Sequence, residues 1–222
     1  MRRVSRVFRG VWAWGLFIAL AAPCRNASAQ LHCDYSGRAY GAFVNVAGFG
    51  PTYFADTGDL PPTGGTLTNS LVNVNVPGII AATTMADTTT GFNCEANSAA
   101  VVQDVTVLQG NLAQVHATLV KSTAHADCAS LKGASTIVGL TFGGLPVVVT
   151  GASNQVVTIP GVATLTIDEQ ISGPGKAFTV NALHLRLLGG TQEVIIASAH
   201  SDVFCTTPAM QRTWGSLKAL YH

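Results

Sequence analysis

The chain has 222 residues, of which 48% are hydrophobic, only 10% are charged and 23 are glycine. This hydrophobicity is too high for a disordered chain. With 12 basic and 11 acidic residues, the chain lacks the basic excess that nucleic acids and anionic membranes attract, so we expect no nucleic acid as a partner.

Residues 1–29 are typical of a secretory signal peptide. An apolar stretch over 11–22 lies between a basic start and the small residues Ala27-Ser28-Ala29, and the basic residues are Arg2, Arg3, Arg6 and Arg9. The apolar stretch is shorter than the ~20 residues of a bilayer-spanning helix. We therefore expect an exported protein, extracellular or in the cell envelope, with no integral membrane span after signal cleavage.

Cleavage would also change the charge of the chain. It removes five arginines and no acid, which leaves 12 − 5 = 7 basic and 11 acidic residues, a net charge of −4. The remaining 193 residues (222 − 29) fit a single β-domain over 30–207, followed by a tail over 208–222.

The rest of the chain is a series of short runs rich in Val, Ile, Thr and Leu, separated by glycine and proline turns. Such runs predict β-strands, at 39–47, 71–76, 79–84, 99–108, 112–122 and several times within 136–200. The Gly- and Pro-rich stretch 48–65 reads as a long surface loop. In the tail, Met210, Trp214 and Leu217 fall at helical spacing, which predicts a short helix that docks on the β-domain.

The clearest hairpin joins 183–188 to 191–198 through Gly189-Gly190. A two-residue loop there places Leu185 opposite Val194 on the core face and Arg186 opposite Glu193 on the solvent face. His184 alternates with the leucines, so we expect it to face solvent beside Arg186.

These observations predict an all-β protein, an antiparallel β-sandwich or β-roll of about ten short strands. A β-solenoid is the alternative fold, but two-residue turns favour hairpins over parallel coils.

Two segments, 122–128 and 198–205, resemble each other, and each contains a His-x-Asp pair before a cysteine. The pairs, His125 with Asp127 and His200 with Asp202, could bind a divalent ion together if the hairpins stack. The interpretation that we favour is two polar turns at strand ends. We therefore predict no metal site and no cofactor.

No catalytic residue stands out. The sequence has no Gly-x-Ser-x-Gly elbow, phosphate-binding glycine loop, His-Glu-x-x-His or Cys-x-x-Cys motif. Asp168 and Glu169 are adjacent acids, but neighbours on a strand point to opposite faces and cannot act together.

Four of the five cysteines lie outside the signal peptide, and an even number in an exported chain predicts two disulfides. Cys94 and Cys128 each end a hairpin unit, and Cys33 and Cys205 bound the domain. The sequence therefore predicts the pairs Cys94–Cys128 and Cys33–Cys205 among three possible connectivities.

Three runs are similar to bacterial surface proteins of the choice-of-anchor P family: TIVGLTFGGLP, IPGVATLTIDEQ and VNALHLRLLGGTQEVIIASAH, all between 136 and 200. The resemblance implies a secreted β-rich protein and adds no catalytic residue.

We expect a non-enzymatic structural or adhesive protein, with envelope components or further copies of itself as partners. The alternative is an extracellular module that binds or hydrolyses a glycan or another polymer. Tyr40, Tyr53, Phe49, Phe54 and Trp214 are the aromatic residues that could stack on a sugar.

Overall fold

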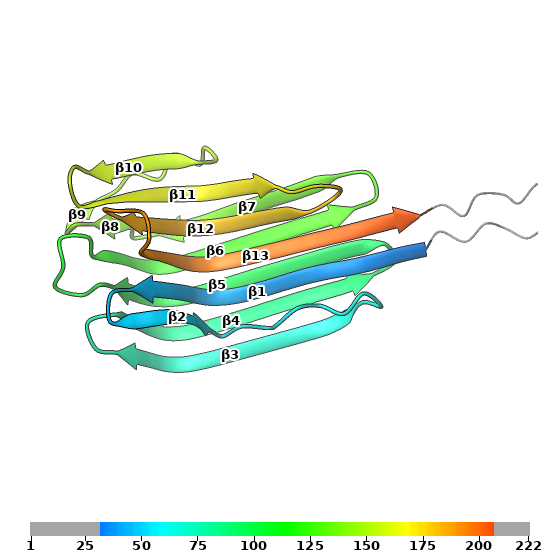
Figure 1. Ribbon diagram of the computed structural model, residues 1–222, viewed down its shortest axis with the longest axis horizontal. Coiled ribbons are helices and arrows are strands. Elements are labelled where there is room, and N and C mark those ends of the chain that lie inside the picture. Colours follow the sequence, from blue (N-terminus) through cyan, green and yellow to red (C-terminus); the bar gives the residue numbers. More distant parts are fainter. Residues whose placement is uncertain (1–31, 207–222) are drawn as a thin grey trace, which may run out of the picture.

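The computed structural model describes residues 32–206, and every regular element in this range is a β-strand (Figure 1). No helix of these residues is long and apolar enough to cross a membrane. The predicted signal peptide at 1–29 and the predicted helix around Trp214 lie outside the described residues.

Within residues 32–206, thirteen strands form two sheets, and all their pairings are antiparallel. Sheet A has six strands in the order β10 (Gln155–Ile159), β11 (Ala163–Ser172), β12 (Phe178–Leu187), β13 (Glu193–Thr206), β1 (His32–Val46) and β2 (Phe49–Phe54). Sheet B has seven strands, β3 (Gly65–Val76), β4 (Ile80–Phe92), β5 (Glu95–Val107), β6 (Val115–Asp127), β7 (Leu131–Val138), β8 (Thr141–Phe142) and β9 (Leu145–Pro146). Both β7 and β8 pair with β6, and β9 pairs with β8.

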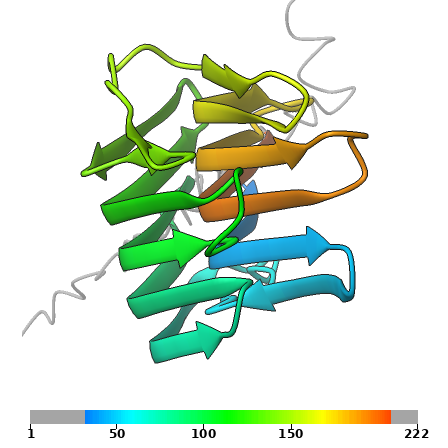
Figure 2. The same ribbon diagram turned by 90° about the vertical axis from the view of Figure 1, so that its left-hand side faces the viewer.

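The two sheets pack face to face as the layers of a β-sandwich (Figure 2). The described part of the chain starts in sheet A with β1 and β2, crosses to sheet B for β3 to β9, and returns to sheet A for β10 to β13. The last described strand then pairs with the first, so β13 and β1 lie side by side inside sheet A, with β2 as the edge strand beyond β1. The predicted antiparallel sandwich is confirmed, and the solenoid alternative is wrong.

The core lies between the sheets and is built from the inward side chains of both. Its largest fully buried members include Met85, Leu165, Leu183, Leu185 and Ile196. Burying a side chain of this size contributes about 1.5–3 kcal/mol. The predicted strands belong to these elements, but many are longer than expected, and part of the expected loop 48–65 forms β2.

The predicted register of the β12–β13 hairpin is confirmed. Leu185 lies opposite Val194, Leu183 opposite Ile196, and Arg186 opposite Glu193. The loop is wider than two residues, however. Beyond the Arg186–Glu193 pair, the Leu187 amide bonds the Gln192 carbonyl and the Gly190 amide bonds the Leu187 carbonyl.

Both sheets bend along a line that crosses the strands (Figure 1). On this line every second strand has a residue with a left-handed backbone: Asn73 (φ 52°), Asp104 (φ 50°), Asp168 (φ 52°) and Ala197 (φ 53°). Pairing continues in the same register on both sides of the bend. The inward-outward alternation changes phase there, which is why the neighbours Ile196 and Ala197 are both in the core.

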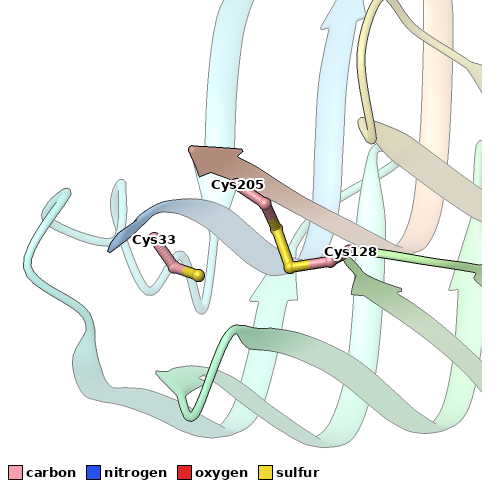
Figure 3. Close-up of side chains that lie close together, drawn as sticks. All are labelled: Cys33, Cys128 and Cys205. Atoms are coloured by element: carbon pink, nitrogen blue, oxygen red, sulfur yellow. A yellow bond between two sulfur atoms is a disulfide. The ribbon is translucent and has the colours of Figure 1, made fainter. Parts of the chain in front are cut away.

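Two disulfides join the sheets at the end of the sandwich where β1 begins and β13 ends. They are Cys33–Cys94, with a Cα–Cα distance of 5.4 Å, and Cys128–Cys205, with 5.8 Å. The predicted pairs Cys94–Cys128 and Cys33–Cys205 are therefore wrong. Cys33 lies directly opposite Cys205 in sheet A, but the two do not bond each other. Cys205 bonds Cys128, as Figure 3 shows, and Cys33 bonds Cys94, so each disulfide joins sheet A to the sheet B side of the sandwich.

The interior towards the disulfide end is partly polar. Four hydroxyl side chains are buried between the sheets: Thr89, Ser98, Ser122 and Ser201. The Ser201 hydroxyl bonds the Ser98 hydroxyl of the opposite sheet at 3.1 Å. Asp87 of β4 is buried on the same inner side as Thr89. Neither of its carboxyl oxygens has a partner at ordinary hydrogen-bond distance and angle. Burial raises the pKa of Asp87 to about 8, although the backbone amides of Val101 and Gly41 partly oppose this.

The raised pKa of Asp87 predicts a loss of stability with rising pH. The folded chain holds this proton more tightly than the unfolded chain, so the free energy of unfolding falls between about pH 4 and about pH 8. Asp87→Asn removes this titration. The free energy of unfolding of the variant, measured with urea, should therefore rise relative to that of the wild type by up to ~5 kcal/mol as the pH increases between these limits. Asp104→Asn, at an exposed acid of β5, is the control and should follow the wild type. If the difference in the free energy of unfolding between Asp87→Asn and the wild type were the same at about pH 4 and at about pH 8, the prediction would be contradicted.

Candidate functional site

The outer face of sheet A carries polar and aromatic side chains in rows across the strands. The register aligns Glu169 of β11, Asn181 of β12, Ser198 of β13 and Tyr40 of β1 in one row. A neighbouring row contains His184, Ile195, Phe43 and Tyr53. Residues that are far apart in the sequence therefore meet on one face of the molecule.

Glu169 is the centre of a hydrogen-bonded network. Its Oε2 atom accepts a hydrogen bond from Asn181 Nδ2 at 2.7 Å and lies 2.6 Å from His184 Nδ1, while Oε1 accepts one from Arg186 at 3.1 Å. The hydrogen bond with His184 is the main reason that the pKa of Glu169 is lowered to about 2, against the opposing effect of burial. The Ser198 hydroxyl extends the network by donating to Asn181 Oδ1 at 2.7 Å.

His184 bridges two carboxylates. Its Nδ1 atom faces Glu169, and its Nε2 atom lies 2.8 Å from Oε2 of Glu193. His184 points away from the core as expected, but it is only 4% exposed, so the prediction that it faces solvent is wrong. Its neighbours on the sheet cover it.

Beside this network, aromatic rings gather where β1 and β2 pair. We call Arg38, Tyr40, Phe43 and Tyr53 the aromatic patch. The Tyr53 ring lies 5.0 Å from Tyr40 and 4.7 Å from Phe43, between ring centroids, and it is 43% exposed. The Arg38 guanidinium lies 4.3 Å from the centroid of the Tyr53 ring.

Asp56 fixes the position of Arg38. The two side chains form a double hydrogen bond, at 2.9 Å from Nε and 2.6 Å from Nη2. This double hydrogen bond is the main reason that the pKa of Arg38 is raised and the pKa of Asp56 is lowered. Both groups therefore stay charged near neutral pH. Fixing the guanidinium over Tyr53 lowers the entropic cost of binding a ligand there.

This arrangement favours binding over proton transfer. At its lowered pKa Glu169 stays ionised near neutral pH, and its protein partners occupy both oxygens, so it is a poor general acid. Its neighbour Asp168 lies on the other side of the sheet, where Oδ2 bonds Gln170 at 2.9 Å, and Gln170 contacts Gly133 of sheet B. The prediction that Asp168 and Glu169 point to opposite faces is confirmed.

The structure separates the two His-x-Asp pairs. His125 lies between the core residues Ala124 and Ala126, so it points outward from sheet B. His200 lies between the buried residues Ala199 and Ser201, so it points outward from sheet A. The pairs are on opposite faces of the sandwich and cannot form one metal site, although the segments that contain them end at the same disulfide.

Local contacts account for the polar residues of both segments. Asp127 accepts hydrogen bonds from the Ser130 hydroxyl at 2.7 Å and from the amides of Ala129 and Ser130, and these bonds, with Ser130 first, lower its pKa. His200 pairs with the Thr179 hydroxyl at 2.8 Å, and burial lowers its pKa. The interpretation of both pairs as polar turns is wrong, because His125 and Asp127 belong to β6 and His200 and Asp202 lie inside β13. Only Asp127, the last residue of β6, borders a turn, and it accepts hydrogen bonds from that turn.

One other group of side chains within 32–206 has the spacing of metal ligands. The sulfurs of Cys33, Cys128 and Cys205 lie within 4.8 Å of one another (Figure 3). All three belong to disulfides, so they are not thiolates and are not available as metal ligands.

The outer face of sheet B is different in character. It carries an open hollow of about 380 Å³ whose lining includes Thr88, Thr90, Thr123, His125 and Lys132. No acidic and no aromatic side chain lines it apart from the imidazole. The hollow therefore offers a ligand neither a carboxylate nor a stacking ring of Phe, Tyr or Trp, whereas the outer face of sheet A offers both.

No protein-family model, curated protein or solved structure matches this chain. The resemblance to the choice-of-anchor P family therefore stays a prediction. Sequence reasoning named Tyr40 and Tyr53 as possible sugar-stacking residues and placed Arg186 opposite Glu193. It missed the bonds of Glu169 with His184 and Asn181, for which the register of β11 would have been needed.

The lowered pKa of Glu169 predicts a pH-dependent cost of Glu169→Gln. At pH 7 the free energy of unfolding of the variant should be lower by ~3 kcal/mol, because a buried carboxylate loses its charge and the charge-assisted hydrogen bonds that it forms with His184 and Arg186. The carboxylate contributes its stability above the unfolded pKa and loses it as the pH falls towards about 2, so the difference should shrink over the same range. Urea unfolding at several pH values measures it, with Glu95→Gln, at an exposed acid of β5, as the control. A cost that stays constant with pH, or no cost at pH 7, would refute this role.

Proposed function

We propose that this chain is an exported, non-enzymatic structural or adhesive protein, and that the aromatic patch on the outer face of sheet A is its contact surface. The observation that carries the proposal is the exposed Tyr53 ring, which two further rings and the Arg38 guanidinium hold in place. Two disulfides suit an oxidising, extracytoplasmic environment.

A polymer with many hydroxyl groups is the ligand that this chemistry suits. The C–H face of a sugar ring is apolar and can stack on Tyr53, while its hydroxyl groups can bond Arg38 and Asp56 beside it. The patch lies on the face of a sheet, which offers a surface to a long chain. Such a surface suits an adhesive role better than the capture of a small molecule, which uses a concave site.

Hydrolysis of such a polymer has less support. The usual glycosidase uses two carboxyl groups, one of which donates a proton. Glu169 and Glu193 are both present, but each bonds His184, and Glu169 has a pKa of about 2. The network is better suited to holding β11, β12 and β13 together beneath the surface.

The test is retention of the purified protein by insoluble polysaccharides, such as cellulose, chitin and peptidoglycan. Tyr53→Ala should weaken retention by at least about tenfold, because it removes a stacking contact of about 1.4 kcal/mol or more. Phe92→Ala is the matched control, since Phe92 is an exposed aromatic residue on sheet B. Thermal unfolding should show that both variants stay folded. Failure of all three polymers to retain the wild type, or equal retention of both variants, would contradict the proposal.

A further inference from the structure

The sandwich has four open edges, and three of them are short or protected against pairing with another strand. In sheet A, β10 has 5 residues, and β2 has 6 residues and contains Pro51. At one edge of sheet B, β7 has 8 residues and contains Lys132, and β9 is a two-residue strand that ends at Pro146. Short strands, prolines and lysines are the features that prevent edges from associating.

The fourth edge, β3, has none of these features. It is 12 residues long, with the sequence GTLTNSLVNVNV, and it contains no charged residue and no proline. Its pairs with β4 run along its whole length from Gly65–Gly91 to Val76–Ile80, and no other described strand pairs with it. In both ribbon views β3 lies at the free end of its layer (Figures 1 and 2).

Apolar side chains on this edge remain open to solvent. Val72 is 68% exposed and Leu71 is 38% exposed, and no residue of β3 is fully buried. A strand laid along this edge would cover them and would bond the outward backbone groups. An exposed, uncharged strand of this length is a template for strand addition.

We propose that β3 pairs antiparallel with β3 of a second copy of this chain, with Asn69 at the two-fold axis. The partner strand must add no buried charge, and β3 itself satisfies this condition. In an antiparallel pair, opposite residues share a face, so a strand paired with itself needs a register that matches its two faces. Centring on Asn69 places Leu67 opposite Leu71 of the second copy, and Thr68 opposite Ser70.

This register pairs apolar residues on the inner side of sheet B and hydroxyl residues on its outer side. Leu67 and Leu71 lie on the inner side of sheet B, since they pair with the buried residues Thr89 and Met85 of β4. Thr68 and Ser70 lie on the outer side. The dimer therefore gains two leucine pairs on the inner side, and hydroxyl contacts on the outer side, in one continuous sheet. This pairing does not depend on the aromatic patch of sheet A.

The association is measured by sedimentation velocity of the protein without residues 1–29, over a concentration range up to about 100 μM. We expect the wild type to be a dimer. Thr68→Lys with Ser70→Lys places like charges opposite each other and should weaken dimerisation roughly tenfold or more. Thr136→Lys, at an exposed position of the opposite edge, is the control and should stay dimeric. A monomeric wild type, or a dimer that the double lysine variant leaves unchanged, would overturn the proposal.

The register has a test of its own. Thr68→Lys with Ser70→Glu places each new lysine opposite a new glutamate when the pair is centred on Asn69, so this variant should dimerise at least as well as the wild type. If the pair were centred on Thr68 instead, the new lysines would face each other and dimerisation would weaken. That result would overturn the proposed register. Circular dichroism of every variant shows that a loss of dimer is not a loss of fold.

Discussion

The pairing of β1 with β13 is the constraint on which the rest of the structure depends. These are the first and last described strands, and their register runs from His32–Thr206 to Asn45–Glu193 inside sheet A. Sheet A can be completed only when the chain returns to its own beginning. Such long-range pairing carries a large loop-closure cost and predicts slow folding.

The disulfides lie at the outer end of this pair, where Cys33 is opposite Cys205. By the chain-entropy estimate each contributes about 4 kcal/mol, because loops of 61 and 77 residues are closed in the unfolded chain.

Most of the fold class could be predicted from the sequence, because strand periodicity and glycine turns are local signals. The β12–β13 register followed from alternation of leucines with polar residues on one side of the bend. Beyond the bend, left-handed residues such as Ala197 reverse the alternation, and nothing local in the sequence marks that position. The strand Phe49–Phe54 was hidden for another reason, since its glycine and proline are typical of a loop, yet it pairs with β1 at an edge.

The disulfides also show what the sequence could predict and what it could not. Sequence reasoning brought Cys33 near Cys205 and Cys94 near Cys128, and both proximities are correct. Residues directly opposite in an antiparallel pair have Cα atoms about 4.5 or 5.5 Å apart, which also suits a disulfide. Proximity therefore could not decide between bonds within a sheet and bonds across the sandwich. The direction of the side chains decides, and it depends on the packing of the two sheets.

The candidate site depends on register across the whole of sheet A. Glu169, His184 and Glu193 come from three strands, and Tyr40 and Tyr53 from two others. An outer face of a sheet is usually solvated, but here Glu169, Asn181, His184 and Ser198 bury one another. Their hydrogen bonds join β11, β12 and β13 on the outer face, beside the aromatic patch.

Non-reducing peptide mapping of the purified protein tests most directly whether the first and last described strands, β1 and β13, are tied to the opposite sheet. The structure predicts one peptide that joins Cys33 to Cys94 and another that joins Cys128 to Cys205, with no free thiol among the four. A peptide that joins Cys33 to Cys205 would place the bond within sheet A and would contradict this closure of the sandwich.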